Sequence, residues 1–182
     1  MEDEALWADV RGRATESVGG LFALEDPARI EVAKDALGQW VDASLFGAPV
    51  RGRIDRTTEA ATWTVTDYKT GAVPSVQHER KRLSGVHVYS LLTEALLGVR
   101  PRRIQLLYLS QPLAISTEPS DQTTRGTRRT MGAIWQAVER ACEREDFRPR
   151  QSRLCNYCAY QNYCPVFGGD PDKARQLATA PA

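Results

Sequence analysis

The sequence has no apolar run of the roughly 18 residues that a membrane-spanning helix needs. Its opening segment, MEDEALWADV, is acidic and lacks the basic-then-apolar order of a secretory signal peptide. Four cysteines in 182 residues are too few for a secreted disulfide framework. These absences lead us to expect a cytoplasmic protein with no membrane partner.

Lysine and histidine are also scarce. Of the 24 basic residues only four are lysine, and the remainder are arginine, whose planar guanidinium suits phosphate groups. The net charge of +1 conceals an acidic first part, since residues 1–50 carry ten acids and four bases. Apolar residues make up 42% and charged residues 26%, which is typical of a globular domain with a buried core. Because lysine is so rare in this sequence, the presence of lysine at position 69 calls for a specific explanation.

The periodicity predicts two helices before residue 45. A weak helix is expected over 4–17, and a firmer one over about 26–44, with Asp26 as its N-cap and Pro27 in its first turn. Gly47 and Pro49 would end the second helix.

Strand and helix patterns alternate through the rest of the chain. We expect an antiparallel hairpin from two alternating runs, a long helix that ends at Gly98, two further strands and a last helix. The predicted ranges are 50–56, 62–68, 75–97, 104–109, 113–117 and 127–145. This order is typical of an α/β domain with a small mixed sheet flanked by helices.

Two acids interrupt the strand-like runs of the predicted hairpin. Asp55 lies in RGRIDR (residues 51–56) and Asp67 in VTDYKTG (residues 65–71). A buried carboxylate is costly unless it is paired or binds a metal, and two carboxylates with water make a hard-oxygen site suited to Mg²⁺ or Mn²⁺. Lys69 lies two residues after Asp67, so both side chains leave the same face of a strand.

This set of residues suits phosphodiester hydrolysis. A metal activates water and offsets charge on the phosphate, and a lysine orients the water or stabilises the developing negative charge. The alternative interpretation is a pair of surface ion pairs on a hairpin, because Asp-x-Lys is a frequent tripeptide.

The two segments together closely resemble the RecB-type branch of the PD-(D/E)XK nuclease superfamily, including AddB-like nucleases, over about residues 25–166. The resemblance implies an αβββαβ core of the restriction-endonuclease type, metal binding by Asp55 and Asp67, and a catalytic Lys69. It also implies a Mg²⁺- or Mn²⁺-dependent deoxyribonuclease, an exonuclease in DNA repair or recombination, that acts on DNA beside a helicase.

The helix after the motif carries Gln-x-x-x-Tyr in that branch. Tyr89 matches the tyrosine, and the resemblance implies that it supports the active site. The glutamine position is Gly85, which removes a polar side chain and costs about 1 kcal/mol of helix stability relative to alanine.

Three cysteines follow the last predicted helix with the spacing C-x₂-C-x₅-C. This spacing brings Cys155, Cys158 and Cys164 within reach of one metal centre, either zinc or an iron–sulfur cluster. The resemblance implies a [4Fe–4S] cluster whose fourth cysteine precedes the nuclease core, but here no cysteine precedes Cys142. Cys142 falls on an apolar helix face, so it is either a core cysteine or a replacement ligand.

The upstream helix of that branch also carries a histidine, and the only histidines here are His78 and His87. We therefore expect an N-terminally shortened nuclease, or the C-terminal part of a longer one. Two alternatives stay open: a non-catalytic DNA-binding or scaffolding module that keeps the nuclease fold, and a zinc-ribbon adaptor.

The expected domains are an N-terminal segment (1–24), the nuclease core (25–146), a cysteine segment (147–168) and a disordered tail (169–182). Basic residues cluster after the motifs at 80–82, 100–103 and 125–129, which favours a sequence-neutral grip on the DNA backbone.

Overall fold

The computed structural model of the protein describes residues 2–59 and 62–179. Side chains are described for all of these except residues 2–3, 33–35, 76–84 and 177–179. The chain divides into two compact units, residues 1–135 and residues 136–182, and each is described by itself.

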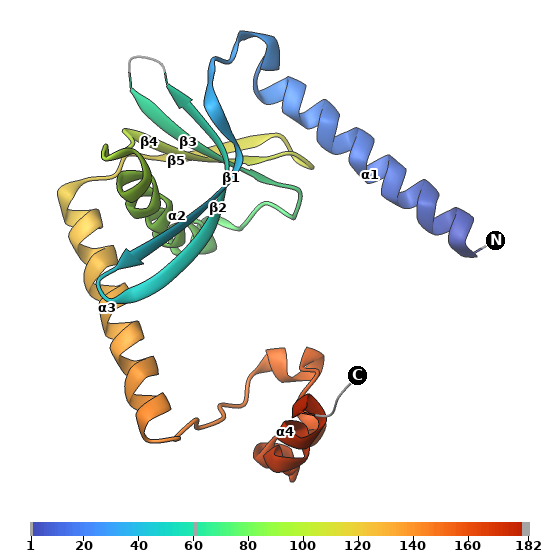
Figure 1. Ribbon diagram of the computed structural model, residues 1–182. Helices are drawn as coiled ribbons and strands as arrows, with labels where there is room; N and C mark the ends of the chain where they lie inside the picture. Colours follow the sequence, from blue (N-terminus) through green and yellow to red (C-terminus); the bar gives the residue numbers. More distant parts are fainter. Residues whose placement is uncertain (1, 60–61, 180–182) are drawn as a thin grey trace. The chain divides into compact units, whose positions relative to one another are not determined.

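A five-stranded mixed sheet organises the first unit (Figure 1). Its strands lie in the order β1-β2-β3-β4-β5, with β3 and β4 parallel and the other neighbours antiparallel. The elements are α1 (Glu2–Leu24), a 3₁₀ turn (Pro27–Arg29), β1 (Val32–Leu45), β2 (Ala48–Glu59), β3 (Trp63–Lys69), α2 (Val76–Leu97), β4 (Arg103–Tyr108), β5 (Leu113–Thr117) and α3 (Asp121–Glu143). The predicted α/β class and the αβββαβ order that the resemblance implies are confirmed.

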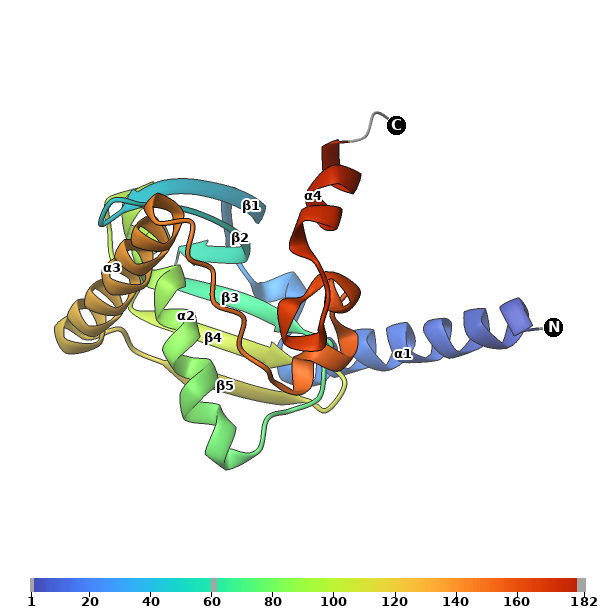
Figure 2. The same ribbon diagram turned by 90° about the horizontal axis from the view of Figure 1, so that it is seen from below.

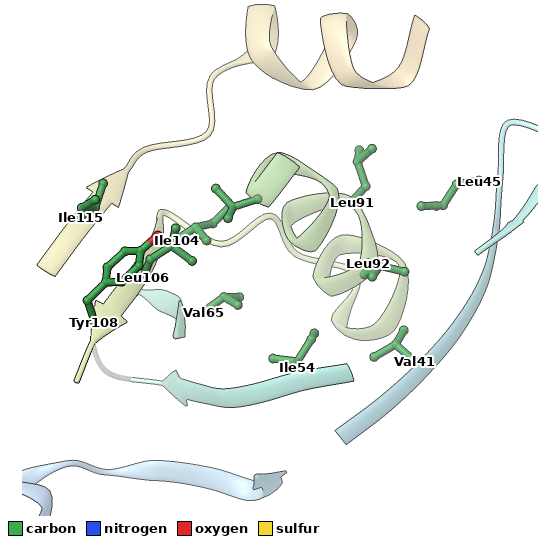
Figure 3. Packing of buried hydrophobic residues seen from close by; sticks show 11 residues of the cluster. Val41, Leu45, Ile54, Val65, Leu91, Leu92, Ile104, Leu106, Tyr108 and Ile115 are labelled. Atoms are coloured by element: carbon green, nitrogen blue, oxygen red, sulfur yellow. The ribbon is translucent and has the colours of Figure 1, made fainter. Parts of the chain in front are cut away.

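Helix α2 covers one face of the sheet, and the core lies between them (Figure 3). Figure 2 shows α2 in front of the sheet, with the C-terminal end of α1 passing behind β4. The buried apolar residues of this layer are Val41, Leu45, Ile54, Val65, Val86, Leu91, Leu92, Ile104, Leu106, Tyr108 and Ile115. Burial of this cluster fixes the position of α2 against the strands that carry both motifs.

The predicted helix over residues 26–44 is wrong. Asp26 does cap a helical turn, because its Oδ1 accepts a 3.1 Å hydrogen bond from the Ala28 amide. That turn is only the short 3₁₀ segment, and the chain then runs as β1, paired antiparallel with β2.

The β1–β2 turn explains this difference. Leu45 pairs with Ala48, and the two residues between them, Phe46 and Gly47, have φ angles of 59° and 80°. Two positive φ angles define the tight turn that matches the twist of a hairpin, and glycine adopts them without strain. The helical spacing of Leu37 and Trp40 was coincidental, since both side chains are mostly exposed on the strand.

The hairpin of β2 and β3, helix α2 up to its Gly98 cap, and the two further strands are confirmed, and these strands, β4 and β5, pair antiparallel. Helix α3 begins at Asp121, six residues before the predicted start at 127. Ser120 and Thr123 exchange hydrogen bonds, Thr123 N to Ser120 Oγ at 3.1 Å and Ser120 N to Thr123 Oγ1 at 2.9 Å. This reciprocal capping starts the helix earlier than its apolar pattern does.

Helix α1 is also longer than the predicted range of 4–17. The second unit contains the end of α3, three 3₁₀ turns (Arg153–Tyr157, Gln161–Tyr163 and Pro165–Phe167) and α4 (Pro171–Thr179). Helix α4 lies in the segment where the sequence predicted a tail without regular structure. Within the described residues, every helix is too short or too polar to cross a membrane.

Candidate active site

Asp67 is a buried carboxylate with two polar partners. It lies near the end of β3 and is only 4% exposed. Its Oδ2 lies 2.5 Å from Lys69 Nζ, and its Oδ1 accepts a 3.0 Å hydrogen bond from the hydroxyl of Tyr89 on α2. The predicted placement of Asp67 and Lys69 on one face of a strand is therefore what the structure has.

Asp55 reaches the same end of β3 from the neighbouring strand. Its Oδ2 accepts a 2.9 Å hydrogen bond from the backbone amide of Tyr68, the residue that follows Asp67. The pairing of β2 with β3 runs from Glu59↔Trp63 to Arg56↔Thr66, so Asp55 and Asp67 are the next residues along the two strands. The side chain of Asp55 thus meets the backbone of β3 beside Asp67.

The direction of Asp55 depends on a change of face within β2. Gly52 and Ile54 face α2, since a Cβ on Gly52 would lie 2.6 Å from Leu92 Cδ1 and Ile54 is fully buried. Thr57 also faces α2, because it pairs with the buried Val65. The side chains that face α2 are therefore at even-numbered positions up to residue 54 and at odd-numbered positions by residue 57. Asp55 lies within this change. Any larger residue at position 52 would require the end of the Leu92 side chain to shift.

Tyr89 is held in its neutral form. Burial raises the pKa of its phenol, and the charge of Asp67, the hydrogen bond to it and the charge of Asp55 raise it further. Both carboxylates therefore act on this hydroxyl. A neutral phenol donates its proton to Asp67, while the half-exposed Lys69 supplies the positive charge that a buried carboxylate needs.

A second polar network lies on the opposite face of the sheet. Arg56 follows Asp55 and is 5% exposed, and its Nη1 and Nη2 donate to Glu25 Oε1 and Oε2 at 2.5 and 2.9 Å. The Tyr68 hydroxyl accepts from Arg56 Nη1 at 2.5 Å and donates to Glu25 Oε1 at 3.1 Å. Thr66 Oγ1 accepts hydrogen bonds from Arg56 Nη2 at 3.1 Å and Gln105 Nε2 at 2.9 Å.

The contacts of this network raise the pKa of Arg56, and burial raises that of Tyr68. Burial opposes the charge on Arg56, but its contacts with Glu25 and Tyr68 outweigh that effect, and the pKa of the guanidinium is raised. Burial raises the pKa of Tyr68 to about 12, an effect that the charge of Arg56 opposes and that of Glu25 reinforces. The buried ion pair of Arg56 and Glu25 is bidentate, the strongest form of such a pair.

The donor set of Asp55 and Asp67 fits Mg²⁺ or Mn²⁺. Mg²⁺ is commonly bound by one or two carboxylates together with waters and phosphate oxygens of the substrate. Among the side chains that the structure describes, no group of three or more His, Cys, Asp or Glu residues is placed to hold a metal ion.

The arginines of the predicted basic clusters are partly engaged in contacts within the first unit and partly exposed. Arg100 pairs with Asp121 at 2.6 Å and Glu94 at 3.6 Å, and Arg128 lies 5.0 Å from the centre of the Phe46 ring. These two arginines hold elements of the first unit together. Exposed arginines are still found in the two clusters at positions 102, 103, 125 and 129. The side chains of residues 80–82 lie outside the described residues.

The four cysteines all carry free thiols. Cys155 lies in the first 3₁₀ turn of the second unit and Cys164 lies between the other two, and both are partly buried, whereas Cys158 is exposed. Their sulfurs are not arranged as a metal centre within the described part of the chain. Cys142 is exposed on α3, so the interpretation as a core cysteine is wrong.

Four of the predicted site residues converge, namely Asp55, Asp67, Lys69 and Tyr89. Glu25 and its contacts with Arg56 and Tyr68 were missed. Arg56 and Tyr68 lie inside the quoted motifs and directly follow the two carboxylates, a position that could have drawn attention to them. Nothing in the sequence around Glu25 connects it with strands 31 and 43 residues away.

Comparison with models of known protein families agrees with this fold. The model of the PD-(D/E)XK nuclease superfamily matches residues 4–165, so the chain belongs to this superfamily. None of the curated proteins matches. Among solved structures, the crystal structure of SSO0001 is similar at 17% sequence identity and a TM-score of 0.45. That match covers 82% of this chain, and the chain spans 66% of the length of SSO0001.

Proposed function

We propose that the protein is a metal-dependent deoxyribonuclease, a RecB-like exonuclease that hydrolyses phosphodiester bonds with Mg²⁺ or Mn²⁺. The observation that carries this proposal is the position of Asp67, buried between Lys69 Nζ and the Tyr89 hydroxyl with the Asp55 carboxylate beside it. Membership of the PD-(D/E)XK superfamily supports nuclease chemistry. The resemblance of its motifs to the RecB branch supports the exonuclease assignment.

Each residue of the site has a distinct role. Asp55 and Asp67 would hold the metal ion, which activates water and offsets charge on the scissile phosphate when bound. Lys69, with its side chain 37% exposed, can leave Asp67 for the attacking water or the phosphate oxygens. Tyr89 keeps Asp67 oriented from the α2 side.

We further propose that the protein acts in the cytoplasm, in DNA repair or recombination, beside a helicase. The repair role and the helicase partner depend on the RecB-type motifs alone, and the cytoplasmic location on the sequence composition. The exposed arginines at positions 102, 103, 125 and 129 support binding to the DNA backbone without sequence preference.

Cleavage of end-labelled linear DNA by the purified protein tests the nuclease proposal. We expect cleavage with Mn²⁺ and none with EDTA, and we expect Asp67→Ala and Lys69→Ala to abolish it. The matched control is Asp42→Ala, which removes an exposed β1 carboxylate paired with Arg51 at 3.4 Å and should leave cleavage unchanged. Cleavage that survives Asp67→Ala would contradict the proposal.

The second candidate is a non-catalytic DNA-binding module. Gly85 favours it, because a polar side chain is missing one helical turn before Tyr89. In that case the wild type and Asp67→Ala would bind DNA equally and neither would cut it with Mn²⁺. The same experiment therefore separates the two candidates.

We also propose a [4Fe–4S] cluster on Cys155, Cys158 and Cys164, with Cys142 as the candidate fourth ligand and zinc as the alternative metal. The sequence spacing supports it, and so does the 3.3 Å contact of the Ser152 amide with Cys155 Sγ. The arrangement of the described residues does not support it. Iron and labile sulfide in the purified protein would favour the cluster, zinc alone would favour an adaptor, and the absence of both would contradict any metal there.

A further inference from the structure

The network of Glu25, Arg56, Tyr68 and Thr66 lies directly behind the candidate metal ligands. Along β3, Thr66 and Tyr68 alternate with Asp67, so their side chains leave the opposite face of the sheet. Arg56 pairs with Thr66 in the register of β2 and β3 and shares that face. Each carboxylate is thus followed in sequence by a residue of this network.

Glu25 joins these two residues. It follows the last residue of α1, and its carboxylate contacts Arg56 with both oxygens and Tyr68 with one. The guanidinium of Arg56 also lies 5.4 Å from the centre of the Tyr68 ring. One side chain directly after α1 therefore contacts both the residue that follows Asp55 on β2 and the residue that follows Asp67 on β3.

We propose that Glu25 is a positioning residue for the metal site, acting through Arg56 and Tyr68. This inference depends on the proposed function, because it concerns the same two carboxylates. The Glu25 contacts hold Tyr68 so that its amide meets Asp55 Oδ2, and this hydrogen bond sets the spacing of Asp55 and Asp67.

Charge makes this arrangement sensitive to Glu25. Arg56 is almost completely buried, and Glu25 is the acid that pairs with it. A buried charge that loses its partner is strongly unfavourable, so Arg56 and the adjoining backbone would rearrange. The carboxylates on the other face would move with that backbone, and the metal would bind less tightly.

The test is Mn²⁺ binding measured by the electron paramagnetic resonance signal of free Mn²⁺, which needs no cleavage. We expect Glu25→Gln to weaken Mn²⁺ affinity by about 10-fold, the usual range for a residue that orients a metal ligand. Cleavage should recover toward the wild-type rate as Mn²⁺ is raised. Glu94→Gln is the matched control, because Glu94 pairs with Arg100 and Arg128 away from the carboxylates.

A double variant separates positioning from stability. Glu25→Gln combined with Arg56→Gln removes both charges and should restore much of the thermal stability that Glu25→Gln loses. Positioning requires that Mn²⁺ affinity stays weak in the double variant, since the bidentate contact is still missing. If affinity instead rises and falls with stability across the set, Glu25 is merely structural and the inference is overturned.

The outcome for the wild type keeps this inference distinct from the proposed function. If the wild type shows no Mn²⁺ binding, or if its Mn²⁺ binding is unchanged in Asp67→Ala, both proposals fail. If Mn²⁺ binding depends on Asp67 but is the same in Glu25→Gln and the wild type, the nuclease proposal stands and only the positioning role is wrong.

Discussion

Lys69 Nζ and Asp67 Oδ2 lie 2.5 Å apart on one face of β3, and this pair places a cation and a candidate metal ligand at a single point. A buried carboxylate in contact with an amine needs no further positive charge while the site is free of metal. The effect of each substitution on cleavage and its effect on the free energy of unfolding are therefore predicted separately.

Tyr89→Phe removes the hydroxyl that donates to Asp67 Oδ1. We expect the cleavage rate at saturating Mn²⁺ to fall roughly 5-fold, because one hydrogen bond contributes about 1 kcal/mol. The unfolding free energy should fall by about the same amount, measured by urea denaturation. An unchanged cleavage rate would show that the Tyr89 hydroxyl plays no part in the site.

Tyr108→Phe makes the same chemical change elsewhere in the core. The Tyr108 hydroxyl is buried and has no hydrogen-bond partner among the described residues. Removing an unsatisfied buried hydroxyl should leave the protein as stable as before or about 1 kcal/mol more stable, with cleavage unchanged. Urea denaturation and the end-labelled DNA assay check both expectations, and a loss of stability would show that this hydroxyl has a partner.

Gly85→Ala should stabilise the protein by up to about 1 kcal/mol, because glycine within a helix is less favourable than alanine by that amount. A Cβ at position 85 meets no atom of the described residues within 4 Å, and none of them opposes the gain sterically. The thermal midpoint measures the effect. Gly85→Gln should give a similar gain and restore a polar side chain one turn before Tyr89.

Gly47→Ala should destabilise the protein, in contrast to Gly85→Ala. Position 47 also has open space around a Cβ, but its φ angle of 80° is one that alanine adopts only with strain. We expect a loss of about 1 kcal/mol in the unfolding free energy. Because the two substitutions differ in backbone conformation and not in crowding, equal effects at Gly47 and Gly85 would contradict the hairpin turn.

Tyr68→Phe should change how stability depends on alkaline pH. The pKa of Tyr68 is raised to about 12 in the folded protein, against an ordinary value near 10. Its contribution is therefore complete below pH 10 and is lost as the pH rises toward 12. The stability difference between wild type and variant should narrow over that interval, as measured by denaturation at each pH, and a constant difference would rule out the raised pKa.

The motif strands could be predicted because their signals are local. Alternation of apolar and polar residues identifies β2 and β3, and the two-residue spacing of Asp67 and Lys69 then fixes their shared face. Strand β1 could not be recognised, because the spacing of Leu37 and Trp40 also fits a helix. Its conformation is decided by pairing with β2 and by the turn at Phe46 and Gly47.

Contacts between segments that are far apart in the sequence could not be predicted from it. Glu25 is 31 residues from Arg56 and 43 from Tyr68, and only the folded sheet brings them together. The exposure of Cys142 was missed for a related reason. An apolar helix face predicts burial only if another element covers it, and the sequence does not show which element that would be.

The hydrogen bond from the Tyr68 amide to Asp55 has a practical consequence for variants. A side chain here takes the place that a backbone carbonyl usually has in a sheet, so Asp55 is at once a candidate ligand and part of the β2–β3 ladder. Asp55→Asn keeps an oxygen acceptor for the amide and removes the charge, whereas Asp55→Ala removes both. The asparagine variant is therefore the better choice for trapping an uncut DNA complex with the sheet intact.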